Sequence, residues 1–337
     1  MNARLTWTIA AGVLALVASV HGAGQSRSVA GQTAGQAGWS ERTPWGDPDF
    51  QGEWTSEGEY GVPFERPPQY GTRAFLTDEE YAKRLEEVRI RDERDLARVD
   101  VLSGNVEGPN APIPHWREYN TTSRRTSLIV DPANGRYPPR VAGAKRWPVP
   151  QRCGTLARGE PCDTYEDYGL GVRCIVHGEG VPDAMFPAVY NANLRIVQSP
   201  GAVAITYELI HDTRVIPIDP SPERDPLSST IRSYMGASRA RWEGTTLVIE
   251  TAHLKTTPRG STDGLRLTER LTRTARDAMA YQVTYRDPAT WTAPWTVALD
   301  LKSRRDDAGV FEYACHEGNY GLQHMLSTSR LFDRRAP

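Results

Sequence analysis

The alternation of apolar and polar residues changes character near residue 193. Beyond it, short runs rich in β-branched and aromatic residues are separated by Gly, Pro and Asp turn signals. The expected strands cover 194–198, 202–210, 214–218, 239–242, 245–251, 265–274, 281–286, 295–301 and 310–315. This pattern predicts a mainly β protein, in which an antiparallel meander over 193–330 closes into a lipocalin-like barrel or stacks as a sandwich.

A helical pattern occurs once before this region. Thr77 and Glu80 form a capping-box sequence, and apolar residues follow it at helical spacing among charged ones. We therefore expect one external helix near 77–97. The rest of 39–192 is rich in Pro and Gly, which predicts a long irregular segment that wraps the core and forms the rim of a site. A short strand is expected at 51–55 and another at 127–130.

The N-terminus predicts export. Residues 1–23 combine an early Arg4, an apolar run and small residues at the exit, which is typical of a signal peptide. The apolar run, 5–20, is shorter than the roughly 20 residues that a membrane-spanning helix needs, so an N-terminal anchor is the less favoured alternative. Residues 24–38 are small and polar and predict a flexible leader. We expect a periplasmic or secreted protein with no stable membrane span after signal removal.

The predicted export indicates the oxidation state of the four cysteines. An even count in an oxidising compartment predicts two disulfides. Of three pairings we favour Cys153–Cys162, which closes a turn-rich loop, and Cys174–Cys315, which ties the start of the β region to its end. A zinc site is the alternative, but the sequence has no CxxC spacing. Oxidised cysteines also disfavour thiol catalysis.

Composition and motifs exclude several classes of function. A net charge of −2 with no basic patch argues against nucleic acid as a partner. The sequence lacks a Walker A loop, a dinucleotide fingerprint, an HExxH motif, an EF-hand loop and a Gly-x-Ser-x-Gly elbow. We therefore expect no cofactor, with a divalent metal as a weakly supported alternative, and a small-molecule ligand or substrate as the partner.

Two histidines stand beside carboxylates. His211 and Asp212 lie between two expected strands, with Glu208 three residues earlier, and His316 and Glu317 follow the last expected strand. Imidazole and carboxylate groups at turns can converge and supply general acid and base. We predict His211 and His316 as base and acid, oriented by the three carboxylates; the alternative is that these are ordinary polar turn residues.

Aromatic and arginine side chains supply candidate substrate contacts. Trp and Tyr pair an apolar face with a polar group, which suits amphipathic or sugar-like ligands, and arginine can hold an anionic group by paired hydrogen bonds. The predicted substrate-binding residues are Arg241, Trp242, Tyr207, Trp291 and His115. Packing against the barrel core and surface ion pairing are the alternatives.

Four segments carry a resemblance to an uncharacterised family of exported bacterial proteins. They are Thr43–Thr55, Glu208–Asp212, Arg241–Val248 and Tyr313–Gly321. The resemblance implies membership of that family and carries over no activity and no catalytic residue. In addition, Gly52-Glu53-Trp54 is similar to the Gly-x-Trp that opens the first strand of lipocalins, where the tryptophan plugs one end of the barrel.

Taken together, these features favour an exported enzyme. It would use His and carboxylate acid–base chemistry on a small amphipathic or sugar-like molecule, as a lyase, isomerase or hydrolase. The alternative function is a non-catalytic, lipocalin-like periplasmic protein that binds the same kind of ligand.

Overall fold

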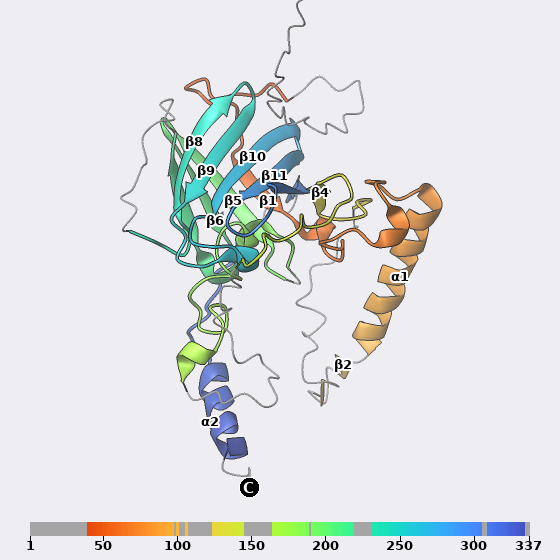
Figure 1. Ribbon diagram of the computed structural model, residues 1–337, viewed down its shortest axis with the longest axis vertical. Coiled ribbons are helices and arrows are strands. Elements are labelled where there is room, and N and C mark those ends of the chain that lie inside the picture. The colour runs from red at the N-terminus through yellow and green to blue at the C-terminus, as the bar shows by residue number, and fades with distance from the viewer. Residues whose placement is uncertain are drawn as a thin grey trace, which may run out of the picture. The chain divides into compact units, whose positions relative to one another are not determined.

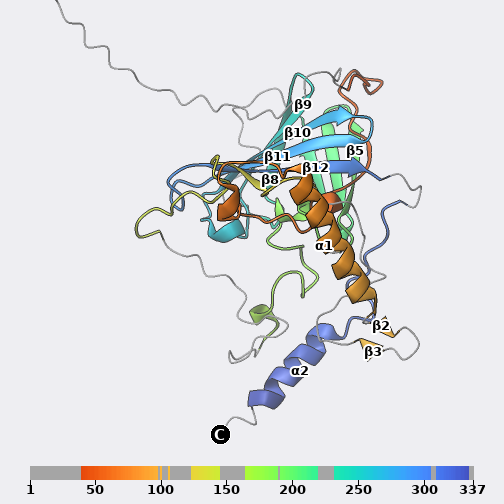
Figure 2. The same cartoon turned by 90° about the vertical axis from the view of Figure 1, so that its right-hand side faces the viewer.

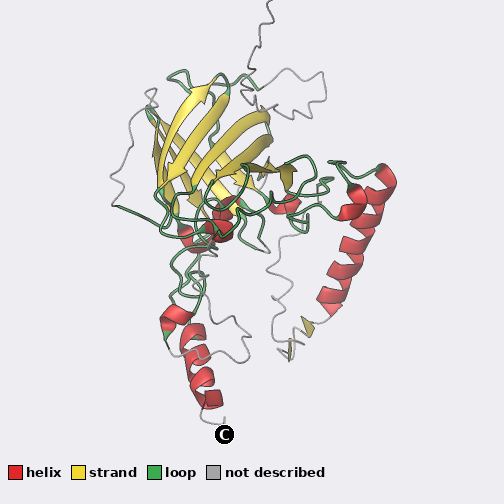
Figure 3. Cartoon of the chain, viewed as in Figure 1, coloured by secondary structure: helices red, strands yellow, loops and turns green. Residues whose placement is uncertain are grey.

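The computed structural model describes residues 39–97, 99–100, 105–106, 123–144, 164–188, 190–218, 231–304 and 309–333. The expected signal peptide, the leader, His115 and the Cys153–Cys162 pair lie outside these residues. Within them the chain is mainly β, with one large antiparallel sheet and two α-helices (Figures 1 and 3).

The sheet curves until it nearly closes into a barrel (Figure 1). Its hydrogen-bonded order is β7-β6-β5-β1-β12-β11-β10-β9-β8, and a tenth strand, β4, pairs with β12. The strands are β1 (Gly52–Thr55), β4 (Ile129–Asp131), β5 (Asn193–Ser199), β6 (Ala202–Tyr207), β7 (Thr213–Pro217), β8 (Ala237–Glu243), β9 (Thr246–Ala252), β10 (Arg266–Ala275), β11 (Ala278–Arg286) and β12 (Trp295–Ser303). A separate two-stranded ladder joins β2 (Val99–Asp100) to β3 (Asn105–Val106).

Strict alternation explains why these strands form a barrel with one buried face. On β11 the buried side chains are Met279, Tyr281, Val283 and Tyr285, while the residues between them are more exposed. Inward-pointing apolar side chains from all the long strands join in one core. The meander predicted from periodicity is therefore confirmed as a barrel.

Trp54 lies inside the barrel, toward the end that carries the short turns β5–β6, β8–β9 and β10–β11. Its side chain is 1% exposed, its indole N–H donates to the Phe50 carbonyl at 3.1 Å, and the Arg273 guanidinium lies 5.0 Å from its ring centre. The same guanidinium lies 4.0 Å from the ring centre of Trp39. The tryptophan of the Gly-x-Trp sequence is thus part of the barrel core.

The predicted helix is confirmed as α1 (Asp78–Ala97), which lies outside the barrel (Figures 1 and 2). The capping box forms as expected, because the Thr77 amide donates to the Glu80 carboxylate and the Glu80 amide donates to the Thr77 hydroxyl. No helix of the described segments has the length and apolar character needed to cross a bilayer.

The C-terminal region differs from the prediction. Residues 310–315 form no strand; they have no regular secondary structure, and α2 (Gly321–Asp333) follows them. The segment bonds to loops instead of a sheet edge: the Phe311 amide donates to Glu208, and the Tyr313 carbonyl bonds to His211. The strand prediction was wrong because β-branched and aromatic residues also suit an extended segment held by loop contacts.

Candidate functional site

The mouth of the barrel is the end at which β6, β9 and β11 finish, and it carries the longer connections. Every described non-glycine residue with a positive φ lies in these connections: Cys174, Asn191, Ile210, His211, His253 and Arg259. Such backbone conformations are costly and persist where surrounding structure holds them, which is common at functional sites. We therefore expect functional side chains at the mouth.

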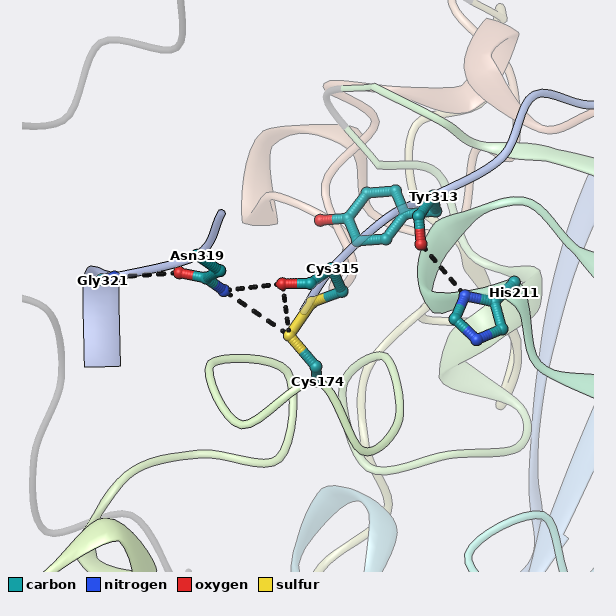
Figure 4. Close-up of a disulfide and its surroundings, with 6 residues drawn as sticks. All are labelled: Cys174, His211, Tyr313, Cys315, Asn319 and Gly321. Atoms are coloured by element: carbon teal, nitrogen blue, oxygen red, sulfur yellow. Dashed lines mark hydrogen bonds between the residues drawn. A yellow bond between two sulfur atoms is a disulfide. The ribbon is translucent and has the colours of Figure 1, made fainter. Parts of the chain in front are cut away.

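The predicted acid–base residues lie on two segments that touch at this mouth. His211 is exposed on the β6–β7 turn, and its Nδ1 atom lies 3.0 Å from the Tyr313 carbonyl oxygen (Figure 4). His316 and Glu317 are exposed on the turn that follows that carbonyl by three residues. The fold thus brings the two predicted histidine segments together, but at the exposed surface.

Glu208 has a different environment from the two histidines. It is fully buried, and its carboxylate accepts hydrogen bonds from the Asn193 side chain at 2.5 Å and from the Phe311 amide at 3.0 Å. It therefore anchors the 311–317 segment to the end of β6.

The predicted substrate contacts occupy different surfaces. Arg241 lies on the outer face of β8, paired with Glu243 at 2.8 Å and with Glu250 at 3.2 Å. Tyr207 is inside the barrel, and Trp242 packs edge-on against Phe50. Trp291 is buried edge-on against Trp295. The structure does not bring these four side chains together in one pocket.

A second group of charged residues is sealed inside the barrel. Arg214 and Glu269 are both almost fully buried and pair at 2.8 Å. Ser238 and Thr251 accept hydrogen bonds from the guanidinium at 2.9 and 3.0 Å, and Tyr281 donates to the carboxylate at 2.9 Å. Apart from Arg214 Nε, which is buried without a partner among the described residues, the network is satisfied by internal hydrogen bonds, so it has the character of a core element rather than an open site.

A cavity of about 170 Å³ opens at the mouth. It is lined by the loop Tyr168–Arg173, by Gly178 and Glu179, by Tyr234 ahead of β8, and by the Lys255–Thr257 segment after β9. Two basic side chains, one carboxyl group and two tyrosines therefore meet in one enclosure. A second, wider hollow follows α1, but its charged residues, such as Glu80 with Arg73 and Lys83 with Glu87, are already paired.

Glu179 is held at its backbone and its side chain. Its amide donates to Asp183 at 3.1 Å, and its carbonyl accepts a hydrogen bond from the Thr256 hydroxyl. The Arg259 amide donates to carboxylate atom Oε2 at 2.9 Å. A carboxyl group fixed in this way is preorganised, which is the property that a catalytic acid or base needs.

The sequence Gly178-Glu179-Gly180 makes this position possible. Both glycines have a positive φ, of 57° and 90°. A Cβ atom on Gly180 would lie 2.1 Å from the Tyr234 carbonyl oxygen, and one on Gly178 would lie 2.8 Å from Asp183. Only glycine fits these two close approaches, so the turn places Glu179 against the cavity wall that carries Tyr234.

Three titratable groups around this turn have shifted pKa values. Burial raises the pKa of Glu179, with a further rise from Asp183 that the Arg259 amide partly offsets. Burial lowers the pKa of His177, although Asp183 acts in the opposite direction. Burial also raises the pKa of Asp212, which accepts a hydrogen bond from the His177 backbone amide. Shifted pairs of this kind are typical of acid–base sites.

Asp212 connects the predicted residues to the cavity group. The hydrogen bond from the His177 amide joins Asp212 to a residue that lies two positions before Glu179 in the chain. Its Oδ2 atom is buried and has no hydrogen-bond partner among the described residues. Of the five predicted acid–base residues, Asp212 is therefore the one that the structure links directly to the 177–183 segment.

The disulfide Cys174–Cys315 (Figure 4) directly follows Arg173, one of the residues that line the cavity. It joins the end of the Tyr168–Arg173 loop to the C-terminal segment, and Asn319 donates to the Cys315 carbonyl at 2.8 Å. Tyr168 also packs against Leu322, Met325 and Leu326 of α2. The predicted Cys174–Cys315 pairing is confirmed, and it links the loop that lines the cavity to the C-terminal segment.

Sequence reasoning missed Glu179, His177 and the cavity. A carboxylate between two glycines was the available signal, because that pattern indicates a side chain presented on a tight turn. Within the described residues, no cluster of three or more His, Cys, Asp or Glu side chains is arranged to hold a metal ion. No protein-family model, curated protein or solved structure matches the chain.

Proposed function

We propose that this protein is an exported acid–base enzyme that acts on a small molecule bound in the mouth cavity. The observation that carries the proposal is the position of Glu179, a rigidly held carboxyl group that lines an enclosed space beside Lys255 and Arg173. Export to the periplasm or medium is part of the proposal and is supported by the N-terminal sequence and the Cys174–Cys315 disulfide.

Glu179 would transfer the proton. One carboxylate oxygen is occupied by the Arg259 amide, which leaves Oε1 to face a substrate. A raised pKa keeps a larger share of the group protonated near neutral pH, which suits a general acid and makes its conjugate base a stronger proton acceptor. Lyase, isomerase and hydrolase chemistry all need such a step.

The residues around Glu179 would hold it in place and stabilise charge on the substrate. Asp183 and Thr256 fix the Glu179 backbone, while Lys255 and Arg173 can stabilise negative charge on the substrate. His211 and His316, the predicted base and acid, lie on the surface segments beside this group and stay part of the proposal as a second proton route. His177 would stay neutral, because burial lowers its pKa.

A binding protein without chemistry is the second candidate. It is favoured by the Trp54 plug at the far end of the barrel, which resembles the lipocalin arrangement. Such a protein would use the same cavity, because the Arg214–Glu269 network occupies the barrel interior. The two candidates differ only in whether Glu179 is needed for turnover.

The test is turnover by the purified mature protein on a panel of small metabolites, with Glu179→Gln as the main variant. Glutamine keeps the size of the side chain and removes the transferable proton. Loss of about 100-fold or more in kcat with an unchanged binding constant would support the enzyme, since general acid–base groups contribute about 10²–10⁴-fold. Glu312→Gln, at an exposed position, is the matched control.

Two further variants separate the proton routes. If His211→Ala and His316→Ala reduce turnover while Glu179→Gln does not, the site lies at the surface pair instead of the cavity. Equal turnover in all three variants and the parent protein would overturn the acid–base proposal and leave the binding protein.

A further inference from the structure

The charge of the mouth cavity indicates what it accepts. Lys255 and Arg173 are its two basic lining residues. The Lys255 ammonium lies 4.8 Å from the Tyr234 ring centre and the Arg173 guanidinium 5.1 Å from the Tyr165 ring centre. Neither forms an ion pair with a carboxylate of the described residues. The rings hold both cations in place without neutralising them.

The acidic groups nearby leave this positive charge in excess. Glu179 is the single carboxyl group among the described lining residues, and its burial favours the neutral form. Asp183, the next carboxylate, does not line the cavity; it pairs with the Arg259 guanidinium at 3.1 Å and accepts a hydrogen bond from the Glu179 amide. A ligand in this space meets two unneutralised cations.

The uncharged lining residues are aromatic, aliphatic, glycine and threonine, and the space is small. Tyr168, Leu170 and Tyr234 supply apolar surface. The volume of about 170 Å³ is close to that of a cavity of about 150 Å³ that binds benzene. The space therefore fits one ring or an aliphatic body of similar size.

Resting on the proposed function, we infer that the substrate is a small carboxylate with a single ring-sized apolar body. Its carboxylate would bond to Lys255 and Arg173, and its body would lie against Leu170 and Tyr234. The Glu179 carboxyl group would then stand beside the body of the ligand, where a proton can be delivered or removed. Arginine pairs with carboxylates in a bidentate manner, which fixes the orientation of the ligand.

The test is isothermal titration calorimetry of the mature chain with three probes of one shape: benzoate, benzamide and benzylamine. We expect benzoate to bind about 10–100-fold more tightly than benzamide, because a hydrogen bond to a charged group contributes about 1.5–3 kcal/mol. Benzylamine should bind more weakly still. Lys255→Met and Arg173→Met should each remove the preference for benzoate while leaving the weak affinity for benzamide unchanged.

Control variants and the Glu179 variant make the outcome decisive. Lys302→Met and Arg286→Met change exposed residues outside the cavity and should leave benzoate binding unaltered. Benzamide or benzylamine binding as tightly as benzoate, or no benzoate binding by folded protein at millimolar concentration, would overturn the inference. Glu179→Gln should retain benzoate binding: if it does and turnover also persists, the enzyme proposal fails while the carboxylate site stands.

Discussion

Arg214 on β7 and Glu269 on β10 form a 2.8 Å ion pair across the interior of the barrel, at the seam where the sheet does not close. Among the described residues, β7 and β8 share one isolated bridge, Ile218–Ala240, and no continuous ladder. The Arg214 guanidinium donates to Tyr207 on β6, Ser238 on β8 and Thr251 on β9 as well as to Glu269. Side chains therefore close the barrel where the backbone does not.

This arrangement predicts that removing either partner of the Arg214–Glu269 pair greatly lowers the free energy of unfolding. Glu269→Gln or Arg214→Met should each lower the free energy of unfolding by about 3–5 kcal/mol, because each leaves a buried charge without its counterpart. The double variant Arg214→Met/Glu269→Gln should lose less than the sum of the two single losses, because no charge remains buried. Urea denaturation of the parent protein and the three variants measures this coupling.

An exposed pair supplies the control for that measurement. Arg270 and Glu243 pair at 2.9 Å with both side chains 41% exposed. Arg270→Met should change the free energy of unfolding by about 1 kcal/mol or less. A similar cost for the exposed and buried pairs would contradict the role given to Arg214.

The disulfide gives a prediction about both stability and the cavity. Cys174→Ser/Cys315→Ser should lower the free energy of unfolding by about 2–5 kcal/mol, because the bond closes a loop across 141 residues of sequence. It should also weaken benzoate binding, since the bond anchors the loop that carries Arg173. Thermal unfolding with and without benzoate measures both effects; unchanged stability would show that the noncovalent contacts of Glu208, His211 and α2 hold this segment without the disulfide.

The sequence was sufficient where structure depends on local pattern. Alternation predicted the long strands, and the capping box of Thr77 and Glu80 predicted α1, because both signals are contained in a few consecutive residues. Helix α2 carried a similar signal that the prediction passed over: Leu322, Met325 and Leu326 are spaced to share one face, which packs on Tyr168.

The site was harder to predict because its parts are remote in sequence. Glu179 lies in a Gly- and Pro-rich segment without periodicity, and its partners Thr256 and Arg259 lie after β9. Arg214 and Glu269 stand at inward positions of predicted strands, but only the register of the closed sheet reveals that they meet. Such contacts follow from tertiary structure, which pattern and spacing do not specify.

Gly180 tests the turn that carries Glu179. Gly180→Ala should destabilise the protein and abolish carboxylate binding, because the new Cβ would collide with the Tyr234 carbonyl. Gly46→Ala is a close control: its φ of 96° resembles the 90° of Gly180, but a Cβ there meets nothing within 4 Å. The Gly46→Ala control should lower the free energy of unfolding by about 1 kcal/mol or slightly more, which is the cost of the backbone strain alone. Equal losses of stability and binding would mean that the close approach to Tyr234 is unimportant.

The raised pKa of Glu179 predicts the pH dependence of stability. The folded protein keeps this proton to higher pH than the unfolded chain, whose carboxyl group titrates near 4.5. Between these two values the folded state binds more protons, so this group makes the free energy of unfolding fall as pH rises. Glu179→Gln, which is neutral at every pH, should therefore show a smaller fall than the parent protein above pH 4.5.

Other titratable groups also make the free energy of unfolding depend on pH, so the Glu179→Gln variant must be compared with the parent protein. Burial also raises the pKa values of Glu59 and Asp212, so part of the fall persists in the variant, and the lowered pKa of His177 contributes with the opposite sign below about pH 6.5. Because both proteins share these groups, the difference between their urea-unfolding free energies across pH 4–8 isolates Glu179. That difference should grow in favour of the glutamine variant and then level off once Glu179 is ionised in the folded state. A difference that stays flat across the range would mean that the Glu179 carboxyl group is as well solvated in the folded protein as in the unfolded chain, which would remove its qualification as a general acid.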